Sequence, residues 1–178
     1  DSNLSNVQFV EIAETINKQR ILEGENDILC SKSGATMLMI VNKNAYLNNG
    51  DSIKPNSAVD IYTLQLDANF NIVKKTLLAQ SSSDIRSYGM LKTPQGFYYF
   101  IKYYKSINVP GTNQSYSNAL RKLNPGSGID GWDYLIIKET NNQIVSSYTI
   151  GFPSGVNPIG SQSSLYFANN SFYFPHNN

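Results

Sequence analysis

Apolar and polar positions alternate along three stretches of the chain, and a short polar turn interrupts each stretch once. These stretches span residues 7–22, 60–77 and 133–150. Alternation with a period of two is typical of a β-strand with one buried face, and a polar turn between two such runs predicts a hairpin. Because the same unit occurs three times, the pattern indicates a repeat architecture.

A second predicted hairpin follows each copy of the first, at residues 28–41, 88–104 and 164–174. Glycine or asparagine lies at the turn of each, and both residue types tolerate the positive φ of tight hairpin turns. No stretch sustains the period of an amphipathic helix, so we expect little or no helix. The predicted strands lie near residues 7–13, 19–23, 35–41, 60–66, 72–78, 87–92, 97–104, 133–139, 143–149, 164–168 and 172–174.

Two turn motifs give the chain a resemblance to a known class of proteins. Residues 66–73 (LDANFNIV) and 93–100 (TPQGFYYF) resemble turns in the four-stranded blades of bacterial β-propeller repeat proteins. The resemblance implies an all-β fold of repeated four-stranded antiparallel blades in one domain or fragment of residues 1–178. The implied units are a half-blade at 1–27, blades at 28–84 and 85–151, and a half-blade at 152–178.

Two blades and two half-blades are fewer than the four to eight of known propellers. Such a partial ring would leave strand edges open at the terminal hairpins, and open edges pair readily with other strands. We therefore expect that the chain either belongs to a longer ring or completes one by self-association, for example as a two-fold dimer.

The charge balance favours some partners over others. Fourteen basic residues against thirteen acidic ones give a net charge of +1, without the basic stripe that a nucleic-acid backbone requires. No apolar run approaches the roughly 18 residues of a membrane-spanning helix.

A charged fraction of 15% in a chain rich in Asn, Ser and Tyr is similar to that of secreted and surface β-proteins of bacteria. We expect an extracytoplasmic location, secreted or at the cell surface, with a lipid anchor as one form of attachment.

Few residues offer catalytic or metal-binding chemistry. His176 is the single histidine, so neither a histidine-based triad nor a multi-histidine metal site can be assembled. The run 67–71 begins like a calcium loop, but Ile72 and Leu78 occupy the positions where an EF-hand needs Gly and Glu. A hairpin turn explains the same residues. The sequence therefore predicts no catalytic residue, no metal site and no cofactor.

The sequence predicts structural roles for three further side chains. Asp60 and Asp133 occupy equivalent positions at the start of a repeated strand, and this repetition favours a structural role for both. Cys30, the single cysteine, lies on an alternating strand and is predicted to be a small buried side chain.

Two long insertions break the repeat, at residues 42–58 and 106–132. Connections of this length are uncommon in compact domains unless they are functional or disordered. Both join equivalent hairpins, so we expect them on the same face, where they would form a binding surface. We also expect that residues 108–130 can be shortened with little effect on folding.

The candidate ligand-binding residues combine flat apolar area with hydrogen-bonding groups, which suits sugar rings or a protein surface. They are Tyr46, Tyr116, Arg121, Asp130 and Trp132. For Trp132, capping of the core beside the strand at 133–139 is the alternative role.

The sequence as a whole predicts a non-catalytic binding or scaffold module that recognises a glycan or a protein through its long insertions. The alternative is a fragment of a larger propeller enzyme whose catalytic residues lie outside this chain.

Overall fold

Antiparallel β-sheet makes up most of the structure, a computed structural model that describes residues 13–15, 27–83, 85–117, 133–150, 166–168 and 171–173. No α-helix occurs among these residues, and a single 3-10 turn, η2 (Pro110–Thr112), lies between two strands. The all-β prediction is therefore confirmed for the described part of the chain. None of the described residues lies in a helix long and apolar enough to cross a membrane.

Fifteen strands are described. The first seven are β1 (Ala13–Thr15), β2 (Asp27–Ser31), β3 (Gly34–Val41), β4 (Ala45–Leu47), β5 (Ser52–Ile53), β6 (Val59–Leu66) and β7 (Ile72–Ser81). The next six are β8 (Ile85–Thr93), β9 (Gly96–Tyr103), β10 (Ser106–Val109), β11 (Gln114–Ser117), β12 (Asp133–Thr140) and β13 (Gln143–Ile150). The last two are β14 (Tyr166–Ala168) and β15 (Ser171–Tyr173).

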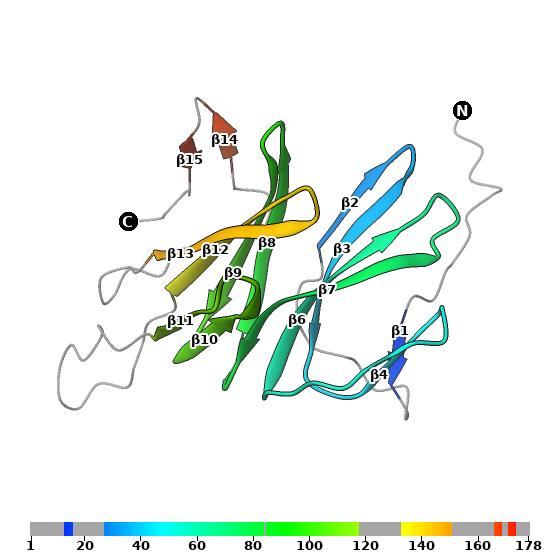
Figure 1. Ribbon diagram of the computed structural model, residues 1–178, viewed down its shortest axis with the longest axis horizontal. Coiled ribbons are helices and arrows are strands. Elements are labelled where there is room, and N and C mark those ends of the chain that lie inside the picture. The colour runs from blue at the N-terminus through cyan, green and yellow to red at the C-terminus, as the bar shows by residue number, and fades with distance from the viewer. Residues whose placement is uncertain are drawn as a thin grey trace, which may run out of the picture.

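The strands form two large sheets (Figure 1). One has six strands in the order β11-β10-β7-β6-β3-β2, and the other has four in the order β13-β12-β9-β8. Two small sheets, β1-β4-β5 and β14-β15, complete the described topology. Strands β2, β3, β6 and β7 thus neighbour one another in chain order, as do β8, β9, β12 and β13, with an insertion after the second strand of each set.

A matched pair of glycines supports the equivalence of the two four-strand sets. Gly34 and Gly96 begin β3 and β9 with φ values of +137° and +127°. A Cβ atom at Gly34 would lie 1.9 Å from the carbonyl oxygen of Leu66, and one at Gly96 would lie 2.1 Å from that of Glu139. Leu66 and Glu139 occupy the same position of the repeated strand, so both turns approach the neighbouring strand at the same place.

The turn between β6 and β7 is closed by a carboxylate. The Asp67 Oδ1 atom accepts hydrogen bonds from the backbone N–H groups of Asn69, at 2.8 Å, and Asn71, at 2.9 Å. The Asn71 side-chain amide donates to the same carboxylate, and these bonds lower the pKa of Asp67. The run that begins like a calcium loop is thus a hairpin turn, as predicted.

The central strands of both large sheets have buried side chains on both faces. Between them lies the largest apolar cluster, to which β9 contributes Tyr99, Ile101 and Tyr103. The opposite face of β9 presents Tyr98 and Phe100 to a smaller cluster with β12. The outer face of the six-stranded sheet packs against side chains of β4 and β5. Alternation along central strands such as β9 and β12 therefore separates two apolar faces rather than one apolar and one polar face.

One buried polar contact lies in the core between the sheets. The Tyr99 hydroxyl donates to the Glu139 carboxylate, and the Thr63 hydroxyl of the opposite sheet also hydrogen-bonds Tyr99. Burial is the main cause of the raised pKa of Tyr99. A buried carboxylate is tolerated in this apolar region because it accepts a hydrogen bond there.

The structure also corrects the sequence analysis. The insertions at 42–58 and 106–132 were expected to be loops, but they contain β4, β5, β10 and β11. The thiol of Cys30 is exposed, not buried. The predicted strand at 19–23 and most of the one at 7–13 lie outside the described residues. The other predicted strands match described strands to within about three residues.

Candidate ligand-binding site

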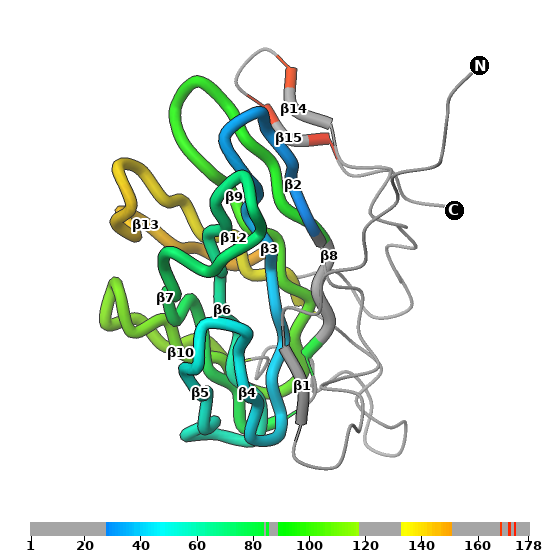
Figure 2. The backbone as a smooth tube through the Cα atoms, turned by 90° about the vertical axis from the view of Figure 1, so that its right-hand side faces the viewer, coloured from blue at the N-terminus to red at the C-terminus, as the bar shows by residue number. Residues whose placement is uncertain are grey.

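The first insertion folds against the outer face of the sheet that contains its own repeat. Strand β4 pairs with β1 on one side and with β5 on the other. Figure 2 shows β4 and β5 side by side. Its side chains Ala45 and Leu47 are buried against that sheet together with Ile53 of β5. The insertion therefore extends the core outward.

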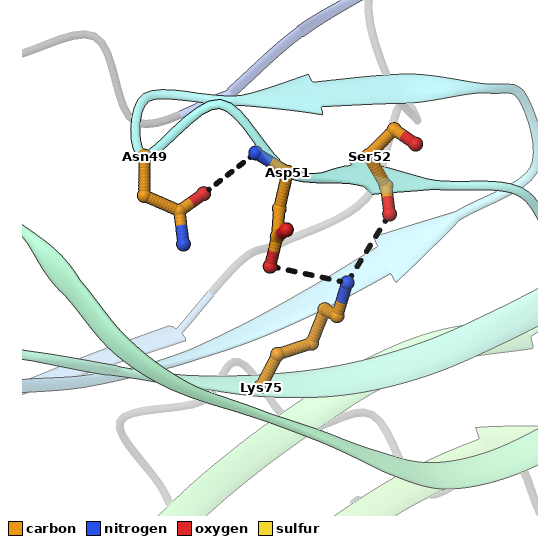
Figure 3. Close-up of polar contacts among 4 residues, drawn as sticks. All are labelled: Asn49, Asp51, Ser52 and Lys75. Carbon is orange, nitrogen blue, oxygen red and sulfur yellow. Dashed lines mark hydrogen bonds and ion pairs between the residues drawn. The ribbon is translucent and has the colours of Figure 1, made fainter.

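One ion pair links the tip of this insertion to β7 (Figure 3). The Lys75 Nζ atom lies 3.7 Å from Asp51 Oδ2 and donates to the Ser52 carbonyl oxygen at 3.1 Å. Asn49 Oδ1 accepts from the Asp51 backbone N–H at 3.0 Å and so shapes the turn. The Asp51 side chain is 60% exposed, so water screens this pair.

The second insertion takes a different path and joins the sheet of the preceding repeat. Strand β10 pairs with β7, with Asn108 opposite Gln80, and with β11 on its other side. Its side chains Ile107 and Val109 are buried in the core between the two large sheets. This insertion thus supplies two strands to the six-stranded sheet.

Tyr116 ties the same insertion to the four-stranded sheet. Its hydroxyl donates to the Ser147 carbonyl oxygen of β13 at 2.7 Å and lies 2.9 Å from the Ser147 hydroxyl. The Ser147 hydroxyl in turn donates to Gln114 Oε1 at 2.7 Å and lies 2.9 Å from the Thr112 hydroxyl. The Tyr116 hydroxyl is therefore engaged by protein groups that hold the two sheets together.

The remaining candidate residues from the sequence are not brought together in the described structure. Tyr46 lies on β4 with its side chain exposed. Arg121, Asp130 and Trp132 lie outside the described residues. Their role in ligand binding stays a prediction.

A pocket of about 500 Å³ lies where the two insertions meet on β7. The first insertion contributes Ser57 and Ala58, and the second contributes β10 and β11. We call this site the serine pocket, and its lining residues are Ser57, Ala58, Gln80, Ser81, Ser82, Ser106, Ile107, Asn108 and Ser115.

Hydrogen bonds between neighbouring side chains order the pocket wall. Ser81 Oγ donates to the Ser106 carbonyl oxygen at 2.6 Å, and the hydroxyls of Ser82 and Ser106 lie 2.8 Å apart. On the adjacent strand pair, Ser115 Oγ donates to Asn108 Oδ1 at 3.1 Å. The polar groups are thus held by β7, β10 and β11 rather than by a free loop.

A buried carboxylate lies behind this wall. The Asp60 side chain is fully buried and accepts hydrogen bonds from the Asn56 backbone N–H at 3.0 Å and from the Ser57 hydroxyl. Gln80 Nε2 donates to both of its oxygens, at 3.2 and 3.3 Å. Asp60 therefore fixes two lining side chains, which agrees with the structural role predicted for it.

The chemistry of the pocket is neutral. Its described lining residues are serines, two amides and two apolar residues, with no ionisable side chain among them. No group of three or more His, Cys, Asp or Glu side chains that could hold a metal ion gathers within the described residues. The pocket can donate and accept hydrogen bonds, but its described residues provide neither an acid nor a base.

A second cavity, of about 340 Å³, lies among the turns at one end of the two sheets. Lys92 lies over the Phe97 ring with its Nζ atom 5.5 Å from the ring centroid, and the exposed Cys30 is on the opposite sheet. Asp67 also lines this cavity, but its carboxylate closes the β6–β7 turn. The Asp67 carboxylate of this cavity is thus already engaged in hydrogen bonds that stabilise the fold.

Sequence reasoning missed the serine pocket because the pairing of β10 with β7 creates it. One local signal was available. The run Gln80-Ser81-Ser82-Ser83 follows the predicted strand at 72–78 with four consecutive polar side chains. A polar cluster after a strand, in a chain with long insertions, indicates a candidate binding surface.

Comparison of the chain with protein-family models, with curated proteins and with solved structures finds no match. The function is therefore argued from the geometry of the chain itself.

Proposed function

We propose that the protein is a non-catalytic binding module of the cell surface or the extracytoplasmic space. In this proposal it recognises a glycan or a protein through the surface where its two insertions meet. The observation that carries the proposal is the serine pocket, because both insertions and β7 contribute to it. An ordered wall of hydroxyl and amide groups without ionisable side chains is suited to binding rather than to acid–base chemistry.

We also propose that the two four-strand sets are blades of a bacterial β-propeller-type repeat. Three observations support this proposal: the matching strand order, the insertion at the same place in each set, and the equivalent glycines Gly34 and Gly96. Burial of both faces of the central strands is what face-to-face blade packing requires. In this proposal the ring is completed by a second copy or by further repeats.

Light scattering tests the completion of the ring. The proposal expects the 178-residue chain to form a dimer or larger closed assembly, or to self-associate through its open edges. A stable monodisperse monomer of 19.8 kDa would contradict it.

A pocket-filling substitution tests the binding function. The Ser82 side chain is exposed and lines the pocket, so Ser82→Trp should fill the pocket and leave the core intact. We expect the wild-type chain to bind members of a glycan array or a panel of surface proteins, and the variant to lose that binding. Ser146→Trp, at an exposed position on β13, is the control. Equal binding by both variants, or no binding by the wild type, would contradict the proposal.

A further inference from the structure

We infer that the serine pocket binds a sugar residue of an uncharged glycan, and that Gln80 and Asn108 determine its specificity. This inference rests on the proposed binding function, and it selects one of the two ligand classes named there. Four features of the pocket carry it: the absence of charge in its described lining, the pairing of β7 and β10 on both of their edges, the orientation of its amides and its volume.

The absence of charged side chains among the described lining residues disfavours ionic ligands. The carboxylate nearest to the described lining belongs to Asp60, which is fully buried and accepts hydrogen bonds from Ser57 and Gln80. A phosphate, sulfate or carboxylate ligand would find no cationic partner among the described lining residues, and a cationic ligand would find no exposed carboxylate among them. Desolvation of an unpaired charge is costly, so a neutral ligand is favoured.

The two strands that supply most of the described lining, β7 and β10, offer no open edge to a peptide strand, whereas β11 is the outer strand of the six-stranded sheet and contributes only Ser115 to the lining. Strand β10 is hydrogen-bonded to β7 on one side and to β11 on the other. Strand β7 lies between β10 and β6. An extended peptide needs a free strand edge to add to a sheet. Recognition by the β7 and β10 part of the serine pocket therefore falls to side chains.

Two amide groups retain one hydrogen-bonding atom each. A carboxylate only accepts hydrogen bonds, so the contacts with Asp60 orient Gln80 with Nε2 toward Asp60 and leave Oε1 as an acceptor. Asn108 Oδ1 accepts from Ser115, which leaves Nδ2 as a donor. Neither Gln80 Oε1 nor Asn108 Nδ2 has a hydrogen-bond partner among the described residues.

A fixed acceptor and a fixed donor on paired strands match the chemistry of a sugar. Gln80 and Asn108 lie directly opposite each other in the β7–β10 ladder. Each hydroxyl of a sugar can donate and accept, so neighbouring hydroxyls of one ring can serve both amides. The serine hydroxyls have the same dual capacity and can adapt to further ring hydroxyls. The volume of about 500 Å³ lies within the range of small-molecule sites.

Titration of the isotope-labelled chain with uncharged oligosaccharides tests the inference. The probes are short fragments of glucan, mannan, galactan and chitin, with sulfated and uronic-acid oligosaccharides as charged comparisons. We expect at least one uncharged fragment to shift the side-chain amide signals of Gln80 and Asn108. Its affinity should be unchanged between low and high salt, because no ion pair contributes.

Two substitutions locate the site. Asn108→Ala and Gln80→Met each remove one hydrogen bond to the ligand, and each should weaken binding about three- to tenfold. Gln143→Met, at an exposed position on β13, is the matched control and should leave the affinity unchanged. A thermal melt of each variant verifies that it is folded, and Asn108→Ala provides the test if Gln80→Met is unfolded.

The outcomes separate this inference from the proposed function. Uncharged-glycan binding that both folded pocket variants retain in full would overturn the inference. Binding restricted to charged glycans or to proteins would also overturn it, while the binding function would stand. Absence of binding to every glycan and protein probe would overturn both.

Discussion

The two insertions occupy the same place in the repeat, yet they are used differently. The first forms a small sheet with β1 on the outside of the molecule and contacts β7 through an exposed ion pair. The second enters the sheet of the preceding repeat, buries Ile107 and Val109 in the central core and hydrogen-bonds β13 through Tyr116. Two insertions at the same topological position can therefore contribute differently to the free energy of unfolding. Burial and backbone pairing decide how strongly each insertion is coupled to the fold.

The largest expected effect on stability concerns Ile107 and Leu47, the buried apolar side chains through which the two insertions contact the core. Ile107→Ala should lower the free energy of unfolding by about 2–5 kcal/mol, because it leaves a cavity in the core between the sheets. Leu47→Ala should cost less, because the cluster around β4 can open locally without separating the sheets. Chemical denaturation measures both effects. Hydrogen exchange should show faster exchange in β4 than in β10, and equal protection of the two strands would contradict the comparison.

An intermediate effect is expected at the tyrosine that joins the sheets. Tyr116→Phe removes the hydroxyl that donates to the Ser147 carbonyl oxygen and should lower the free energy of unfolding by about 1–3 kcal/mol. Tyr46→Phe makes the same chemical change at an exposed position of the first insertion and should have no measurable effect. Denaturant midpoints compare the two. Equal shifts would show that Tyr116 does not couple the sheets.

The smallest effect is expected at the ion pair of the first insertion. Asp51→Asn removes the charge that faces Lys75 and should change the free energy of unfolding by about 0–1 kcal/mol, because the pair is exposed. Added salt should reduce this difference further. A loss above about 2 kcal/mol, which an exposed pair does not supply, would mean that the first insertion is coupled to the sheet as strongly as the second.

Long alternating strands could be predicted from the sequence, and the short strands of the two insertions could not. Strands such as β6 and β12 contain eight residues each, enough for alternation and a turn motif to define them. Strands β4, β5, β10 and β11 contain two to four residues each, and contacts with distant strands decide their pairing. The edge strand β2 shows a related limit. Ile28, Leu29 and Cys30 are consecutive apolar residues, so alternation alone does not say which of them face outward.

The candidate site resembles the strands in how far it could be predicted. Features that depend on local or repeated sequence could be predicted, and contacts between distant segments could not. The structural role of Asp60 could be predicted because it depends on repetition within the chain. The serine pocket depends on Asn108 lying opposite Gln80 in β7, a contact between segments that are distant in sequence. The polar run that begins at Gln80 can be seen in the sequence, but only the pairing of β10 with β7 places it beside the second insertion.

The pairing of β10 with β7 also bears on how such a chain could grow by duplication. A strand from the second repeat completes the sheet of the first, so the boundaries of the folded unit and of the duplicated unit do not coincide. A gene segment that ended after β9 would encode a first repeat whose β7 lacks a neighbour on one side. Gain or loss of repeats would therefore be tolerated only when the insertion of the following repeat is inherited with them. Selection would then act on overlapping pairs of repeats rather than on single repeats.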